Sequence, residues 1–416
     1  MKEILKGSLI IFIFKIFGAI SLFLIYLLIP RYYGIEVFGV FNLIFGILII
    51  GTVFSRMGLD TYILRIISSL DEDAETTSSF LKEVFKILFF SSIFVGLFIV
   101  LISEILNTYI FKSIDATNYL LVLALLILPY TFFNILPEVF RGFDDIKIYS
   151  FFRNFLQNFL ILLFLATSIL MSWNYSPIYI LYVALFVISV VVILVAVFFL
   201  RKRNIQLRQA GKYNKKILIH SYPMFLATSI MFLMSYVDSF MIGYYLDEYQ
   251  VGIYSACINL SMLITFIPMA IGGFISPKVS KYYSSGEKQK VKDIFKNSLI
   301  IIVVVTIPIF MIIYFYAEFF LGLFGKAFIV ATTTLLITNI AFLSEALCGP
   351  VGFILNMTDN QHIFMKILII ALLINIIFNS LLIPIYGING AAVAMLLSML
   401  FWTISSFVVL KRKEII

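Results

Sequence analysis

Twelve long apolar segments constrain the fold of this chain more than any other feature. Most approach or exceed the ~20 residues that a helix needs to cross a hydrocarbon core about 30 Å thick. Inside lipid every backbone polar group must find its partner within the protein, and a helix satisfies this requirement within one segment. The sequence therefore predicts an all-α polytopic membrane protein with twelve transmembrane helices. The segments lie at 9–29, 38–56, 84–105, 119–139, 154–171, 178–200, 217–243, 253–275, 298–320, 328–355, 365–385 and 390–410.

Composition supports a membrane protein and argues against several other classes. Only 12% of the 416 residues are charged, whereas soluble proteins carry about 25%. The first segment is too long for the apolar part of a signal peptide and lacks a small-residue cleavage site, so we expect it to be retained. Two cysteines and two histidines in unsuitable positions predict neither a disulfide framework nor a metal site.

The basic residues predict the orientation. If the N-terminus is cytoplasmic, all but four of the 30 lysines and arginines fall on cytoplasmic connections or segment ends; the exceptions are Lys15, Arg31, Lys112 and Lys326. Cytoplasmic loops of membrane proteins carry such an excess. We therefore expect both termini in the cytoplasm. The net charge of +8 is then explained by topology and by contact with anionic lipids, without any nucleic-acid partner.

The chain repeats itself at an offset of about 214 residues. Glu104 at the end of the third segment corresponds to Glu318 at the end of the ninth, and Pro137 corresponds to Pro350. "RYYGIEVFGVFNL" likewise parallels "GYYLDEYQVGIYSACINL". Because each half holds six segments, both halves start on the same side of the membrane. Parallel repeats of this kind are a transporter architecture in which two bundles rock about a site between them.

The repeat divides the chain into three predicted parts. These are an N-terminal six-helix lobe at 1–200, a basic cytoplasmic linker at 201–216 and a C-terminal six-helix lobe at 217–416.

Motifs for enzymatic chemistry are missing. The chain contains no G-x-x-x-x-G-K-[ST] phosphate loop, no H-E-x-x-H and no G-x-S-x-G, so we expect no ATP hydrolysis and no hydrolase activity. The outer connections are short, which disfavours a membrane glycosyltransferase or polymerase. The sequence predicts a transporter that is not an enzyme.

Lys15 is the most unusual ionisable residue. It follows Lys6 by nine residues, which at 1.5 Å per residue places it roughly 13 Å into the hydrocarbon. A charge at this depth costs a few kcal/mol and marks a candidate functional site. Its helix face is polar only in part, with Ser8 and Tyr26 nearby. Lys15 either faces a cavity or snorkels towards the inner interface; its short reach favours the cavity.

Four further charged residues are candidates. Arg56 and Asp60, one turn apart near the inner end of the second segment, could pair with each other or serve the site. Asp238 corresponds through the repeat to positions 23–25, some 13 Å outward of Lys15, so the lysine is left free for an anionic ligand. Glu345 lies at a depth close to that of Lys15 and is either its partner or a protonatable coupling group. Asp60, Asp238 and Glu345 are the ion-coupling candidates.

Polar residues at the starts of two equivalent helices complete the prediction. Arg153 and Lys366 open the fifth and eleventh segments at the inner face. They either anchor the helices or gather phosphate from the cytoplasmic leaflet. Asn158 and Asn375, within these helices, either bind sugar hydroxyls or join neighbouring helices. Lys15, Arg56, Arg153, Lys366, Asn158 and Asn375 are therefore the predicted substrate-binding residues.

The chain resembles a known family over essentially its whole length. "PRYYGIEVFGVFNL", "MGLDTYILRIIS", "VDSFMIGYYLDEYQVGIYSACINL" and "ISPKVSKYYSSGEKQKV" are similar to the polysaccharide transporters of the multidrug/oligosaccharidyl-lipid/polysaccharide (MOP) flippase superfamily. Members of this branch are O-antigen and capsule repeat-unit flippases. Lipid II flippases of the same superfamily usually have fourteen helices, whereas we predict twelve here.

The resemblance implies a function. Such a protein moves an undecaprenyl-pyrophosphate-linked oligosaccharide from the cytoplasmic to the outer leaflet of the bacterial cytoplasmic membrane, by alternating access and without a cofactor. A proton or sodium gradient could drive the step. The implied partners are membrane lipids, a polysaccharide polymerase and a chain-length regulator. The main alternative is a proton- or sodium-coupled multidrug exporter, and a membrane glycosyltransferase or polymerase is a second one. Lys15 and Arg56 favour an anionic cargo over cationic drugs.

Overall fold

The computed structural model of the protein describes residues 2–68, 74–112, 116–173, 175–207 and 216–416, with side chains from Ile13 onward. The described residues form helices and no strands. Twelve of the helical stretches are long and apolar enough to cross a membrane. Each of them overlaps one of the twelve predicted segments, so the prediction of an all-helical, twelve-span membrane protein is confirmed.

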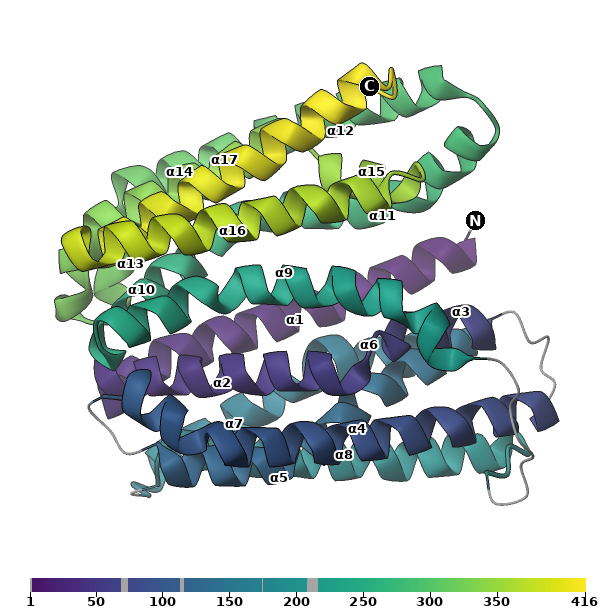
Figure 1. The fold of residues 1–416 in the computed structure, drawn as a ribbon, viewed down its shortest axis with the longest axis horizontal. Coiled ribbons are helices and arrows are strands. Elements are labelled where there is room, and N and C mark those ends of the chain that lie inside the picture. The colour runs from purple at the N-terminus through teal and green to yellow at the C-terminus, as the bar shows by residue number, and fades with distance from the viewer. Residues whose placement is uncertain (1, 69–73, 113–115, 174, 208–215) are drawn as a thin grey trace. The chain divides into compact units, whose positions relative to one another are not determined.

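The chain divides by its internal contacts into two units, Met1–Phe232 and Leu233–Ile416, and the division falls inside α9. Figure 1 traces the chain from the N-terminus to the C-terminus. Unit 1 contains α1 (Lys2–Tyr33), α2 (Ile35–Arg56), α3 (Leu59–Ile67), α4 (Ala74–Tyr109), α5 (Thr117–Gly142), α6 (Ile146–Ser150), η1 (Phe151–Leu156), α7 (Gln157–Leu170), α8 (Pro177–Lys202) and the first part of α9 (Ile217–Tyr245). Most of the predicted linker, at 208–215, lies outside the described residues.

Unit 2 contains the rest of α9 and the helices that follow it. These are α10 (Glu248–Ser261), η2 (Met262–Thr265), α11 (Phe266–Ser284), α12 (Lys288–Phe315), α13 (Ala317–Phe324), η3 (Lys326–Ala331), α14 (Thr332–Cys348), α15 (Val351–Met357), α16 (Gln361–Tyr386) and α17 (Ile388–Arg412). In this unit α17 packs along α16 and α14.

Two predicted segments are divided in the structure. The segment at 328–355 ends as a helix at Cys348, because Gly349 adopts a left-handed φ of 75° and Pro350 follows it. A short helix, α15, then begins at Val351. The segment at 298–320 is likewise divided at Tyr316 into α12 and α13. Hydropathy does not detect these breaks because the flanking residues remain apolar.

Local backbone geometry recurs in the two units. After α8, Asn204 is left-handed and the Ile205 amide donates to Leu200 O at 3.0 Å. After α17, Glu414 is left-handed and the Ile415 amide donates to Leu410 O, again at 3.0 Å. Both are Schellman-type helix ends with a buried apolar residue after the turn. These equivalent helix ends support the internal repeat; the lobe boundaries read from the sequence stay a prediction.

A sharp break separates α2 from α3. Met57 and Gly58 both have positive φ, 49° and 73°. A Cβ at Gly58 would lie 2.5 Å from both Ser221 O and Phe225 N of α9. Only glycine therefore allows this close contact together with this backbone conformation. The break redirects the chain immediately after Arg56.

Candidate functional site

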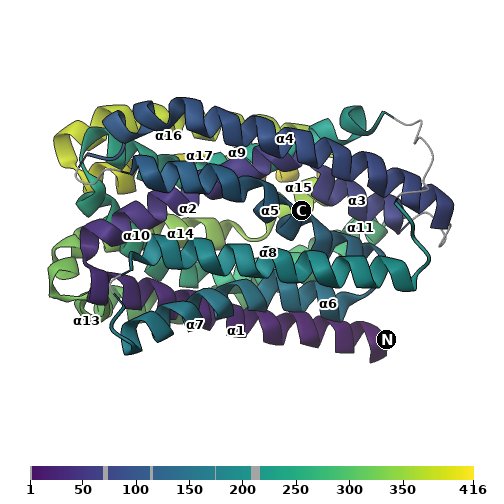
Figure 2. The ribbon, with the colours of Figure 1, turned by 90° about the horizontal axis from the view of Figure 1, so that it is seen from below.

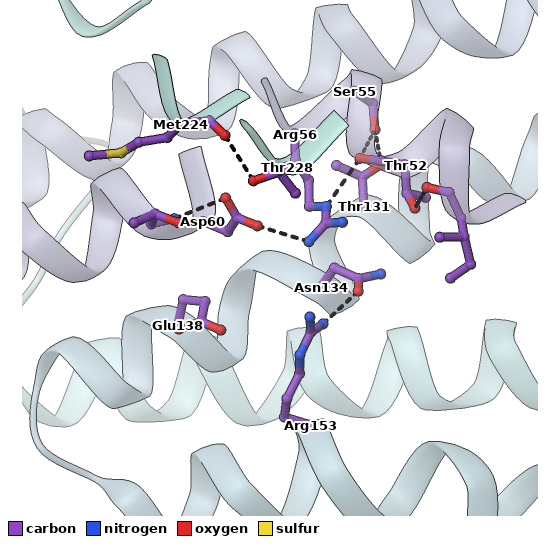
Figure 3. A network of polar contacts seen from close by, with 12 residues as sticks. Thr52, Ser55, Arg56, Asp60, Thr131, Asn134, Glu138, Arg153, Met224 and Thr228 are labelled. Atoms are coloured by element: carbon purple, nitrogen blue, oxygen red, sulfur yellow. Dashed lines mark hydrogen bonds and ion pairs between the residues drawn. The ribbon is translucent and has the colours of Figure 1, made fainter. Parts of the chain in front are cut away.

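Unit 1 holds a group of five polar side chains from four elements, which we call the arginine cluster. Its members are Arg56, Asp60, Asn134, Glu138 and Arg153. Figure 3 shows the two guanidinium groups approaching Asn134 from opposite sides. A buried arginine in a membrane protein is costly and marks a functional-site hypothesis.

Arg56 is held by its own helix and by the first turn of α3. Its side chain is only 4% exposed. Its Nη1 contacts Asp60 Oδ2 at 3.0 Å, and its Nε donates to Thr52 O at 3.1 Å. Asp60 Oδ1 in turn accepts from the Thr61 amide. The predicted local pairing of Arg56 with Asp60 is therefore present. Among the described residues, Nη2 of Arg56 makes no hydrogen bond.

Arg153 enters the cluster from a π-helical turn. The residues of η1 form a π-helix between α6 and α7, a distortion that often accompanies functional sites. Arg153 Nη1 donates to Asn134 Oδ1 at 2.7 Å, and Asn134 Nδ2 donates to Tyr130 O at 2.8 Å. Asn134 thus fixes the position of the Arg153 guanidinium.

Glu138 is a member of the cluster that our sequence interpretation missed. Its side chain is buried on α5, one turn beyond Asn134, and its Oε2 lies 3.5 Å from Nη1 of the half-exposed Arg141. A carboxylate within a predicted span is itself a signal. "LPEVF" could therefore have indicated it.

The α1 helix is fixed directly against the π-turn. A Cβ on Gly18 would lie 1.7 Å from Asn154 O, so the backbones of α1 and η1 are in direct contact. Asn158 Nδ2 donates to Gly18 O at 3.0 Å. Figure 2 shows α1 and α7 side by side. The amide nitrogen of Asn158, a predicted sugar ligand, therefore joins two helices.

Unit 2 contains a separate polar group, which we call the Asp238 cluster: Asp238, Tyr254, Asn375, Asn379 and Ser398. Asp238 is 6% exposed. Its Oδ1 accepts from Asn375 Nδ2 at 3.0 Å and from Asn379 Nδ2 at 2.6 Å, and its Oδ2 accepts from the Tyr254 hydroxyl at 3.0 Å. Asn375 Nδ2 also lies 3.4 Å from Ser398 Oγ. Within the described residues these partners are neutral, and Asn379 Oδ1 is buried without a partner.

The remaining predicted residues make no hydrogen bond or ion pair with a cluster member among the described residues. Lys15 is exposed on α1 and Lys366 is exposed near the start of α16. Glu345 is half-buried on α14. Among the described residues none of the three has an ion-pair partner.

Comparison with known proteins identifies one protein family and several related proteins. The family described as "Polysaccharide biosynthesis protein" matches residues 12–333. Curated relatives include two proteins of Haloferax volcanii, the probable low-salt glycan biosynthesis flippase Agl15, 28% identical over 184 residues, and the probable flippase AglR, 30% identical over 168 residues. These alignments cover 42 and 40% of this chain but only 39 and 35% of the relatives.

Solved structures share the fold at low sequence identity. The lipid II flippase MurJ in an inward closed conformation gives a TM-score of 0.75 at 16% identity, covering 99% of this chain and 89% of that one. An inward-facing multidrug resistance transporter of the MATE family, in the MOP superfamily, gives 0.73 at 14% identity, covering 98 and 93%. At these identities the similarity establishes the MOP-type fold alone.

Proposed function

The chain belongs to the polysaccharide biosynthesis protein family, and from this premise we propose that it is a flippase for a lipid-linked oligosaccharide. The cargo moves from the cytoplasmic to the outer leaflet by alternating access, and no covalent bond is made or broken. The family match, the two relatives named as flippases and the MOP-type fold support this function.

The arginine cluster is the single observation that carries the proposal. A lipid-linked glycan has an apolar tail that can stay in the bilayer and a phosphate-containing headgroup that cannot cross it unaided. Guanidinium groups bind phosphate oxygens through paired, charge-assisted hydrogen bonds. Arg56 and Arg153 hold such groups inside unit 1, on either side of Asn134. In this proposal the guanidinium nitrogens that Asp60 and Asn134 leave free bind the phosphate oxygens. Lys15 of unit 1 and Lys366 of unit 2 stay predicted substrate-binding residues.

The finer assignment follows the resemblance in the sequence. The cargo is then an undecaprenyl-pyrophosphate-linked repeat unit for O-antigen or capsule synthesis in the bacterial cytoplasmic membrane, with a polymerase and a chain-length regulator as partners. The named relatives are archaeal, so the headgroup chemistry shared by both sources, a polyprenyl phosphate or pyrophosphate carrying a glycan, is the core of the proposal.

Asp238 is the preferred ion-coupling residue of the three candidates. A buried carboxylate with only neutral partners is costly unless it takes up a proton or a cation. Asn379 Oδ1, which has no partner in the described structure, supplies an additional oxygen ligand close to it. Asp60, by contrast, is already neutralised by Arg56. In this proposal a proton or a sodium ion binds at the Asp238 cluster and drives the transport cycle.

Reconstitution tests the function. The purified chain is placed in liposomes that contain a fluorescent polyprenyl-pyrophosphate oligosaccharide, and a membrane-impermeant glycosidase reports the arrival of glycan on the opposite leaflet. We expect the wild type to expose the glycan and Arg56→Ala with Arg153→Ala to reduce the rate at least ~10-fold, as loss of charge-assisted hydrogen bonds predicts. Arg65→Ala, an exposed arginine on α3, is the matched control. A wild-type rate equal to that of empty liposomes would overturn the proposal.

The same liposomes separate the alternatives. A multidrug exporter would transport ethidium and ignore the glycan, and a polymerase would lengthen the glycan in detergent. An imposed sodium or proton gradient should accelerate glycan flipping by the wild type. It should not accelerate flipping by Asp238→Asn, whereas Glu318→Gln, an exposed carboxyl of the same unit, should behave as the wild type.

A further inference from the structure

A hollow of about 670 Å³ lies in unit 2 and shares no lining residue with the Asp238 cluster. Three segments form it: the α9–α10 turn, η3 with the start of α14, and the α16–α17 turn. These segments meet at the end of the unit opposite to the C-terminus (Figure 1). The volume falls within the ~300–1,000 Å³ of small-ligand sites. Its lining residues are Leu246, Asp247, Tyr249, Gln250, Ile253, Ala327, Val330, Thr334, Tyr386, Gly387, Ile388 and Asn389.

The lining combines aromatic rings with polar groups that have spare hydrogen-bonding capacity. Asp247 caps α10, and its Oδ1 accepts from the Gln250 amide at 2.8 Å. Its Oδ2 has no partner among the described residues. Thr334 donates to Asn389 Oδ1 at 2.7 Å, which orients Asn389 so that its amide nitrogen remains available. The rings of Tyr249 and Tyr386 line the hollow together with aliphatic side chains, and Tyr386 is 62% exposed.

Charge excludes a phosphate group as the ligand of this hollow. The only charged residue among those that line it is Asp247, and no lysine or arginine contributes. A pyrophosphate would be repelled there. A saccharide is the ligand class that matches: its C–H faces pack against tyrosine rings and aliphatic groups, and its hydroxyls pair with amides and a carboxylate. Tyrosines are common at membrane interfaces, but an interfacial belt does not require Asp247, Gln250 and Asn389 around one concavity.

We propose that this hollow is a saccharide-binding subsite for the glycan of the transported lipid, separate from the phosphate-binding arginines. The inference rests on the proposed function. With cytoplasmic termini the hollow faces the outer side, where the glycan emerges. It would hold the sugar after translocation, while the polyprenyl phosphate remains with the membrane.

The test uses the free oligosaccharide, released by mild acid from the lipid-linked glycans of the native host, so that neither lipid nor phosphate contributes to binding. Saturation-transfer NMR and titration calorimetry measure its binding to the full chain in nanodiscs. We expect saturable binding that weakens at least ~10-fold, or 1.4 kcal/mol, in Tyr386→Ala and in Tyr249→Ala. Ala327→Trp, which fills the hollow and removes no polar group, should abolish binding. Tyr316→Ala is the control, because Tyr316 is 63% exposed in the same unit and does not line the hollow.

The outcomes distinguish the subsite from the function. If liposomes flip the lipid-linked glycan but the free oligosaccharide does not bind, the subsite is overturned and the flippase function stands. Binding that survives Ala327→Trp places the sugar elsewhere and also overturns the subsite. If the free sugar binds as expected but no flipping occurs, the flippase function fails while the saccharide site remains.

Discussion

A guanidinium buried in a membrane helix is tolerated only while its counter-charge is in place. Asp60 supplies this counter-charge for Arg56. Its carboxylate neutralises Arg56, which is 4% exposed, across 3.0 Å. Removing one partner of a buried ion pair leaves an unpaired charge and costs about 3–5 kcal/mol, whereas replacing both partners by apolar residues is often neutral. Because Asp60 is 17% exposed, the lower end of that range applies.

We therefore expect Asp60→Ala to lower the free energy of unfolding by about 3 kcal/mol. The double variant Arg56→Met with Asp60→Leu should recover most of this stability but flip the lipid-linked glycan more slowly than the wild type, because it lacks Arg56. Thermal unfolding in detergent and the liposome assay measure the two quantities. An Asp60→Ala protein as stable as the wild type would show that water already screens the pair.

Lys15 gives a second prediction at this scale. It is exposed on α1 and has no ion-pair partner among the described residues, which agrees with both a cavity-facing and a snorkelling lysine. We expect Lys15→Ala to reduce glycan flipping about 10-fold, the loss of one charge-assisted hydrogen bond, without lowering protein abundance. Lys15→Arg should be partly tolerated.

The control for Lys15 is Lys288→Ala, an exposed lysine at the start of α12. Wild-type flipping by Lys15→Ala would instead indicate a lysine that snorkels to the interface.

Between elements, the contact of α1 with the π-turn is the one least able to accept a side chain. A Cβ on Gly18 would lie 1.7 Å from the carbonyl oxygen of Asn154. Because this neighbour is backbone, it cannot rotate away as a side chain would. Either the two helices separate or the π-turn shifts, and the second change would also move Arg153.

Gly18→Ala should therefore lower the melting temperature, with a cost of about 1–3 kcal/mol from overpacking, and should reduce flipping. Gly273→Ala on α11 is the matched control, because nothing lies within 4 Å of its added Cβ and an alanine favours the helix by up to about 1 kcal/mol. Equal melting temperatures for the two variants would contradict the close contact seen here.

The sequence predicts some of these features and not others for a physical reason. Hydropathy shows which segments are apolar and long enough to cross a membrane, so all twelve spans were predictable. The pairing of Arg56 with Asp60 was predictable because the two residues are four apart on the chain. The contact of Arg153 with Asn134 joins two helices, and that of Asp238 with Asn379 joins residues 141 apart. Pairings of this kind depend on helix rotation and packing, which a single sequence does not encode in its periodicity. The π-turn was hidden as well, because its sequence, FFRNFL, contains no proline or glycine that would mark a change of helix type.

For the whole molecule, its orientation in the membrane decides on which side of the membrane each site opens. The described structure has twelve candidate spans, and an even number places both termini on one side. The excess of lysine and arginine on one set of connections predicts that this side is the cytoplasm. The saccharide subsite would then open outward, and Arg153 and Lys366 would lie near the inner face.

Cysteine labelling measures this orientation within unit 2. Lys288 begins the α12 span, and Lys326 follows α13 and begins the next candidate span, Lys326–Cys348; both lysines are exposed. After replacement of Cys257 and Cys348 by serine, Lys326→Cys should react with a membrane-impermeant maleimide in intact cells. Lys288→Cys should react only after the membrane is permeabilised. Because one helix crosses the membrane between them, the two sites control for each other. The reversed result would show the opposite orientation in the membrane, with the hollow on the cytoplasmic side. The hollow would then bind the glycan before translocation rather than after it.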